Sequence, residues 1–149
     1  MLAPIRIIEP ERLNNISIDG KWEEIELAVD SGATESVCPN DLAEHVPTEE
    51  GAASKRGVMY EVASGDQITN EGEKSLKAMT EDGVEKRMVL QVTDVNQGLL
   101  SVSKATSAGN RVVFDEAGSY IENKTSGAKT WLQQKNGMYM LKLWVQRPF

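Results

Sequence analysis

Cysteine and histidine are the scarcest reactive residues in this sequence, which has one of each among its 149 residues. The single cysteine, Cys38, permits neither an internal disulfide nor a C-x-x-C metal or redox motif. The only histidine, His45, stands seven residues away, with no sign of the third group that would orient a thiol and an imidazole for catalysis. We therefore expect Cys38 to be a small core residue, His45 to be a surface residue, and the chain to occupy a reducing compartment.

Long apolar runs and clusters of positive charge are also missing. No stretch approaches about 18 consecutive apolar residues, and the first residues have neither the apolar region nor the cleavage site of a signal peptide. The formal charge is -7 and the 16 basic residues are scattered, which argues against a dedicated nucleic-acid binder. Neither a G-x-G-x-x-G phosphate loop nor an H-E-x-x-H zinc motif occurs. We expect a soluble, intracellular protein with no metal, no cofactor, no membrane contact and no nucleic-acid partner.

The sequence is instead rich in short alternating or apolar runs between turn signals, a pattern typical of a mostly β domain. The run at 22–29 becomes continuously apolar toward its end, which predicts a strand whose end is buried. Two hairpins are expected further along the chain. One pairs 58–63 with 68–76 around Ser64-Gly65-Asp66, and the other pairs 74–80 with 85–92 across Asp82-Gly83. The polar, small-residue stretch at 49–57 is typical of a loop.

The second half of the chain predicts one short helix followed by a β-meander. Ser101 or Ser103 is a candidate N-cap and Gly109 is a stop signal, which gives a helix of about two turns. After it, apolar runs alternate with E-A-G, T-S-G and N-G turns. The expected organisation is an extended arm at 1–20, a core domain at 21–109, and a β extension at 110–149 packed on the core or on a dimer interface.

The most informative stretch is E-L-A-V-D-S-G-A at 26–33, where an apolar strand ends in a carboxylate and enters a tight turn. A carboxylate activates water only when its environment sets its pKa, and two carboxylates about 3 Å apart achieve this by sharing one proton. In such a site Ser31 supplies a bridging hydroxyl, Gly32 lets backbone N–H groups approach, and Ala33 leaves room for a substrate. Asp30 is therefore a candidate for acid and base catalysis of peptide hydrolysis.

The order of these features resembles the retropepsins, the aspartic proteases of retroviral type. An apolar run, Asp30-Ser31-Gly32-Ala33, a glycine-containing hairpin, another apolar run and a short helix follow one another in both. A closer likeness, to the protease segment of Copia-type retrotransposon polyproteins, comes from G-L-L-S-V-S-K-A-T-S-A-G at 98–109, V-V-F-D-E-A-G-S-Y-I at 112–121 and N-G-M-Y-M-L at 136–141. The resemblance implies a closed or partly open β-barrel with one short α-helix, formed by a protease core at 21–109, plus a C-terminal β-meander extension.

Carried over residue by residue, the resemblance makes Asp30 the catalytic carboxylate, with Ser31 and Gly32 as its support. The substrate-binding residues that it implies are Ala33 and the tip of a flap that closes over bound peptide, namely Val62, Ala63, Ser64, Gly65 and Asp66. Leu99 and Leu100 are expected to pack behind the catalytic turn. This sequence departs from the family pattern at Ser101, where many retropepsins have glycine, and in the forty residues after Gly109, where they have a short terminal strand.

No second Asp-Ser-Gly or Asp-Thr-Gly occurs in the chain, so one molecule holds half of a catalytic dyad. The second carboxylate then has to come from another copy, related to the first by a two-fold axis. We expect an obligate homodimer whose cleft takes an extended peptide or polyprotein segment and accepts apolar side chains in alternating pockets. The resemblance implies that such a protease works in the cytoplasm or within virus-like particles.

Other interpretations of the same residues stay open. Asp-Ser-Gly is common as a plain turn, and with Ser36 it resembles a phosphodegron, although an apolar strand precedes it here. Gly65 and Gly72 fit ordinary hairpin glycines equally well. A retropepsin-like module that no longer cuts and serves as a dimerisation or scaffold unit would keep these residues. Core or interface packing is expected for the bulky residues near the C-terminus, Trp131, Met138, Tyr139, Met140 and Trp144.

Overall fold

The computed structural model describes residues 22–147, so the arm expected at 1–20 lies outside the described residues. Most of the regular structure consists of strands, which confirms the prediction of a mostly β protein. The strands are β1 (Trp22–Asp30), β2 (Val37–Cys38), β3 (Met59–Glu61), β4 (Gln67–Thr69), β5 (Gly72–Met79), β6 (Glu85–Val92), β7 (Leu99–Ser101), β8 (Asn110–Val113), β9 (Tyr120–Asn123), β10 (Lys129–Trp131), β11 (Gln133–Lys135) and β12 (Met138–Gln146). The helices are α2 (Ala52–Lys55) and α3 (Val102–Ser107), and neither has the length and apolar character needed to cross a bilayer.

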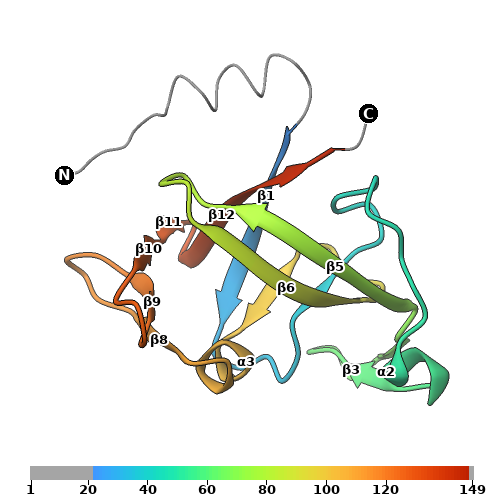
Figure 1. Cartoon of the computed structure of the whole chain (residues 1–149). Helices are drawn as coiled ribbons and strands as arrows, with labels where there is room; N and C mark the ends of the chain where they lie inside the picture. Colours follow the sequence, from blue (N-terminus) through green and yellow to red (C-terminus); the bar gives the residue numbers. More distant parts are fainter. Residues whose placement is uncertain (1–21, 148–149) are drawn as a thin grey trace.

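The main sheet closes on itself. Its strands follow the order β1-β7-β2-β6-β5-β12, and β12 also pairs with β1, which completes a ring. The β1–β12 ladder is antiparallel from Trp22 opposite Gln146 to Ala28 opposite Met140. Figure 1 shows the β5–β6 hairpin on the near side of this ring, with β1 and β12 behind it. The ring leaves few open strand edges, which are the usual sites of unwanted pairing.

Alternating side chains fill the interior of the ring. The inward positions of β5 and β12 recur every second residue, as expected for strands with one buried face. The largest fully buried apolar side chains are Leu27, Leu90, Leu143 and Val92. Cys38 is also fully buried, which confirms its prediction as a core residue. Ile121 of β9 joins the same cluster, so the separate β8–β9–β10 sheet packs against the barrel.

The hairpin predicted across Asp82-Gly83 is confirmed. β5 and β6 pair antiparallel from Gly72 opposite Val92 to Met79 opposite Glu85. Gly83 takes a φ of 85°, and the Thr80 N–H donates to the Val84 carbonyl at 2.9 Å. Glycine adopts this left-handed backbone conformation without steric cost, which is why the Asp-Gly pair predicted a hairpin turn here.

The other predicted hairpin exists, but its second strand is shorter than expected. β3 and β4 pair around Gly65, whereas the strand predicted at 68–76 is interrupted after Thr69. Gly72, at φ 135°, turns the chain there, and a Cβ at this position would lie 2.6 Å from the Glu49 carbonyl oxygen. The prediction of one continuous strand at 68–76 was wrong. The chain bends at Gly72, where it passes close to the Glu49 backbone, and a residue with a side chain would not tolerate this bend.

The C-terminal segment forms the predicted meander and also part of the barrel wall. β8, β9 and β10 form an antiparallel sheet, and the β11–β12 hairpin adds to the main sheet. β12 lies between β1 and β5, and its Leu141, Leu143 and Val145 side chains are buried. The division of the chain at residue 109 stays a prediction, but the barrel ring requires β12.

Bulky residues near the C-terminus are less buried than expected. Met140 is buried, as predicted, and Tyr139 and Trp144 are half-buried. Trp131 and Met138 are 55% and 42% exposed, so they do not pack in the core of one chain, and the alternative of interface packing stays a prediction for them. The Trp131 ring lies against Tyr120, with the ring centroids 5.0 Å apart, and covers Gly118.

Two local features of the loop between β2 and β3 also differ from the expectations. The stretch predicted as a loop contains the one-turn helix α2, where Ser54 Oγ accepts a hydrogen bond from the Gly51 N–H at 2.9 Å. His45 is half-buried rather than a surface residue. Its ring lies 3.1 Å from Glu23 Oε1 and 2.9 Å from the Gln146 carbonyl oxygen, so it ties this loop to the ends of β1 and β12.

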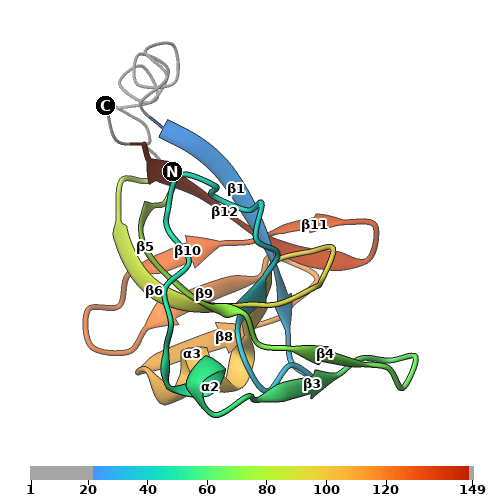
Figure 2. The same ribbon diagram turned by 90° about the vertical axis from the view of Figure 1, so that its right-hand side faces the viewer.

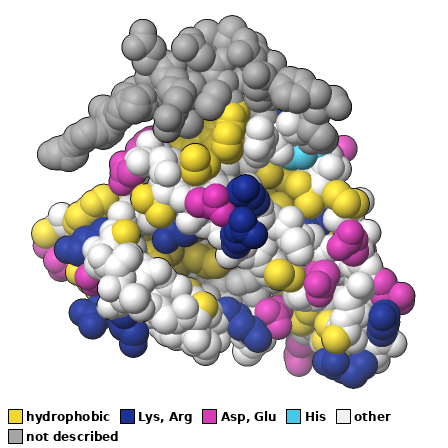
Figure 3. Space-filling model, viewed as in Figure 1, with side chains coloured by type: hydrophobic (Ala, Val, Ile, Leu, Met, Phe, Trp, Pro, Cys, Tyr) yellow, Lys and Arg dark blue, Asp and Glu magenta, His cyan; other side chains and the backbone are white. Residues whose placement is uncertain are grey.

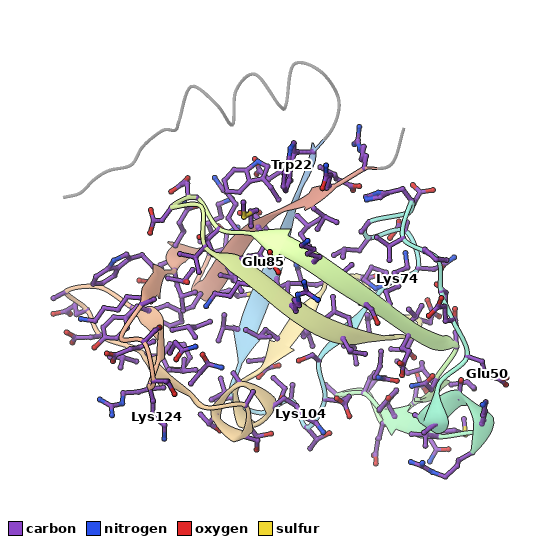
Figure 4. All side chains as sticks on the ribbon, in the orientation of Figure 1. Trp22, Glu50, Lys74, Glu85, Lys104 and Lys124 are labelled. Atoms are coloured by element: carbon purple, nitrogen blue, oxygen red, sulfur yellow. The ribbon has the colours of Figure 1, made fainter. Side chains whose placement is uncertain are left out.

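Lys74 is the most unusual residue of the interior, because it is a lysine with only 1% of its surface exposed. Its ammonium group donates to three backbone carbonyl oxygens, those of Asn40 and Leu42 at 2.8 Å and that of Ala43 at 3.1 Å. Figure 4 shows Lys74 on β5, reaching toward the loop that follows β2. All three donor positions of a lysine are thereby used, and the loop is fixed to the barrel.

We predict that Lys74→Met lowers the free energy of unfolding by about 3 kcal/mol or more, because several buried carbonyl groups lose their donor at once. Urea denaturation followed by tryptophan fluorescence measures this loss. Lys77→Met, on the exposed face of the same strand, is the matched control and is expected to change stability by about 0.5 kcal/mol or less. Equal losses in the two variants would show that the carbonyl contacts contribute nothing.

Candidate active site

Asp30 is the last residue of β1, where the strand leaves the barrel interior. The two residues before it, Ala28 and Val29, are buried, and Asp30 itself is half-buried. β1 runs parallel to β7 here, with Val29 opposite Leu100 and Asp30 opposite Ser101. The apolar run positions the carboxylate at the mouth of the barrel because the buried strand ends there.

The residues after Asp30 form a tight turn around its carboxylate. The Gly32 N–H donates to Asp30 Oδ1 at 2.8 Å, so the turn fixes the side chain that the sequence singled out. Ser31 and Gly32 are exposed, and the Ser31 hydroxyl makes no hydrogen bond to any described residue. The bridge predicted for Ser31 is therefore not made within one chain.

Two buried serines hold this turn against β7 and α3. The Ser101 hydroxyl donates to the Ala33 carbonyl at 2.7 Å, and the Ser101 N–H donates to Ser36 Oγ at 2.9 Å. Ser101 Oγ also accepts from the Lys104 N–H at 3.2 Å, which confirms it as the N-cap of the predicted helix. A glycine at position 101 could make neither side-chain contact, so the departure from the retropepsin pattern has a defined structural effect.

Ser36 is the site residue that the sequence analysis missed as a structural support. It is 65 positions from Ser101 along the chain, and no local pattern links the two. The available signal was the position of Ser101 at the end of an apolar run, because a buried backbone N–H at a strand end requires an acceptor from elsewhere in the chain.

The five predicted flap residues come together at the tip of the β3–β4 hairpin. The Val62 N–H donates to the Asp66 carbonyl at 2.9 Å, the Gly65 N–H donates to the Val62 carbonyl at 2.8 Å, and Ser64 Oγ donates to Asp66 Oδ2 at 3.1 Å. Ala63 completes the turn, and Gly65 takes a φ of 91°. Figure 2 shows this hairpin projecting from the body at the same end of the molecule as the turn after β1.

The structure thus groups the predicted residues into two sets. Asp30, Ser31, Gly32 and Ala33 share one turn, and residues 62–66 share another, with no hydrogen bond between the two sets among the described residues. Within one chain the tip of the β3–β4 hairpin projects outward from the body.

The alternative chemistries weighed from the sequence find little support. Burial raises the pKa of the Cys38 thiol to about 11, which keeps it protonated and unreactive near neutral pH. Both ring nitrogens of His45 already have partners, the Glu23 carboxylate and the Gln146 carbonyl oxygen at the end of β12. Within residues 22–147 no group of three or more His, Cys, Asp or Glu side chains is arranged to hold a metal ion.

Comparisons with models of known protein families, with curated proteins and with solved structures found no match. The interpretation of the site therefore depends on its residues and geometry.

We predict that Ser101→Ala lowers the free energy of unfolding by about 1–3 kcal/mol, because the Ala33 carbonyl and the first turn of α3 both lose a partner. Thermal or urea unfolding measures the loss. Ser107→Ala, in the same helix, is the matched control, since Ser107 is exposed and its hydroxyl makes no hydrogen bond among the described residues, and it is expected to change stability by about 0.5 kcal/mol or less. If both substitutions were equally mild, Ser101 would not support the turn.

Proposed function

We propose that this protein is an aspartic endopeptidase of the retropepsin type, which processes a retrotransposon-like polyprotein as a homodimer. Each copy contributes one Asp30 to a dyad that shares a single proton. The ionised carboxylate takes a proton from a water molecule, and the protonated one polarises the peptide carbonyl. Ser31 and Gly32 support the dyad, and the hairpin tips at 62–66 close over an extended peptide.

The observation that carries this proposal is the setting of Asp30. A half-buried carboxylate ends a strand that is locked in parallel to β7, while the next two residues stay exposed. A plain surface turn has no need of a buried apolar strand before it or of a serine brace behind it. The same setting leaves the outer face of the turn available to an identical turn from a second copy, as an isologous interface requires.

The surroundings of Asp30 support the same function. The β3–β4 hairpin projects from the same end of the molecule and carries exposed backbone groups suited to an extended peptide. Ala33, which is half-buried beside the carboxylate, offers little steric hindrance.

We predict that Asp30→Asn reduces self-cleavage of a fusion with flanking polyprotein sequence by at least about a hundredfold, because an amide cannot act as the base. Gel and mass-spectrometric analysis of the products measures the cleavage. Asp82→Asn, in the exposed β5–β6 turn, changes the same chemical group away from the site and is expected to cut normally.

Processing that survives Asp30→Asn would overturn the protease proposal. A wild-type fusion that never cuts, even when concentrated and acidified, would favour the non-cutting dimerisation or scaffold module that the sequence left open.

We also predict that the cleavage rate is highest below neutral pH and declines as the pH rises toward 8. The dyad needs one protonated carboxylate, and this proton is lost as the pH rises. Initial rates on a peptide substrate, with fluorescence as a check on folding at each pH, measure the profile. The Cys38 thiol, with its pKa at about 11, does not titrate in this range. A rate that still increases above about pH 8 would contradict a shared-proton dyad.

A further inference from the structure

Two lysines lie on the inward faces of the β5–β6 hairpin, and only one of them has hydrogen-bond partners among the described residues. Lys74 of β5 donates to three carbonyl oxygens. Lys86 follows the inward pattern of β6 together with Met88 and Leu90, yet it takes part in no ion pair or hydrogen bond within residues 22–147. Burial lowers the pKa of the Lys86 ammonium, a sign that water solvates it incompletely. A half-buried charge without a partner is costly and calls for an explanation.

The Lys86 side chain lines a cavity of about 300 Å³ between the barrel wall and α3. Its floor is apolar and includes Leu100, Ile121 and Leu141. Arg87 and Lys104 also line the cavity, but each already faces a carboxylate, Arg87 that of Glu85 at 2.8 Å and Lys104 that of Glu35 at 3.6 Å. Among the described residues, Lys86 is thus the charge on the cavity wall that lacks an acidic partner. Figure 3 shows a hollow with a hydrophobic floor beside basic side chains on this face, and Figure 4 places Lys104 below the hairpin.

One edge of β6 opens toward the same cavity. β2 pairs with β6 only at Gln91 and Val92, and the Gln91 N–H points away from β5, toward the Ser36 carbonyl at 2.9 Å. Backbone groups alternate in direction along a strand, so Arg87 and Val89 present their N–H and C=O groups to the same side. No described strand pairs with them there. The ring of the barrel is therefore hydrogen-bonded at one end of β6 and open at the other.

We propose that this open edge of β6 binds a short extended peptide that carries an acidic and an apolar side chain two residues apart. The peptide backbone pairs with Arg87 and Val89, its carboxylate meets Lys86, and its apolar side chain enters the cavity. Strand addition supplies affinity through the main chain, and the cavity and the charge supply specificity. This site is separate from Asp30, and the proposal does not depend on proteolysis.

A second copy of this chain is a poorer occupant of the edge. Pairing two β6 edges would bring Lys86 of each copy toward the same lysine of the other without supplying a carboxylate to either, and like charges oppose such pairing. Edge lysines also serve in some proteins to prevent pairing altogether. If Lys86 only prevents pairing, removing it should promote pairing at this edge, whereas the proposal predicts that removing it weakens peptide binding. The experiment below distinguishes these two roles.

The test uses the full chain with Asp30→Asn, so that cleavage cannot remove the probe. The probe is the acetylated, amidated peptide Thr-Glu-Thr-Leu-Thr, titrated by NMR. We expect saturable binding that weakens about tenfold when the peptide Glu is replaced by Gln, and by a similar factor for Lys86→Gln. Lys77→Gln, on the exposed face of β5, is expected to leave the affinity unchanged. Ala105→Leu, which fills the cavity from α3, is expected to weaken binding of the same peptide.

Hydrogen exchange tests the backbone pairing. The amides of Arg87 and Val89 are expected to become protected when the peptide binds, while those of Lys86 and Met88, which point toward β5, stay as they were. Any of three results would overturn the proposal. These are an absence of saturable binding at millimolar peptide, equal affinity of the parent chain for the Glu and Gln peptides, and no new protection at Arg87 and Val89. Self-association of Lys86→Gln without any peptide binding to the parent chain would show that the lysine only protects the edge. The Gln peptide keeps the test decisive if Lys86→Gln fails to fold.

Discussion

The parallel pairing of β1 with β7 is the constraint on which the site depends. It holds Asp30 opposite Ser101 at the point where β1 leaves the core. Because Ser101 ends β7 and caps α3 at once, the same residue connects the strand, the helix and the turn that carries the carboxylate. The catalytic proposal therefore depends on a buried polar contact between segments far apart in sequence. This contact holds the turn after β1 more firmly than a surface loop with the same sequence would be held.

Several polar residues inside the barrel have their hydrogen bonds satisfied by distant parts of the chain. Lys74, Ser101 and Ser36 are buried, and each finds hydrogen-bond partners within the chain. Half-buried Lys86 has no such partner among residues 22–147, and it lies where the edge of β6 lacks a described neighbouring strand. Closure of the ring by β12 makes the C-terminal segment part of the fold, so a second copy is not needed to complete the barrel. In the proposed function, a second copy is needed only to supply the other Asp30.

Much of the local structure was predictable because its causes are local. Asp82-Gly83 predicted the β5–β6 turn, and Ser101 with Gly109 predicted the limits of α3. The turn at Asp30 followed from an apolar run that ends in Asp-Ser-Gly. Contacts across long sequence separations were not predictable from the same patterns. These include the break at Gly72 against Glu49, the three carbonyl contacts of Lys74, and the bond from Ser101 to Ser36. Each is set by which strands meet, and periodicity alone does not specify that.

The central claim is that one carboxylate from each of two copies forms a single catalytic unit. Mixing unfolded wild-type and Asp30→Asn chains, refolding them together at constant total concentration and measuring peptide cleavage tests it directly. If both carboxylates are required, activity falls with the square of the wild-type fraction, so an equal mixture retains about one quarter of the activity. If activity instead falls in proportion to the wild-type fraction, each chain works alone and the account of a shared dyad is contradicted.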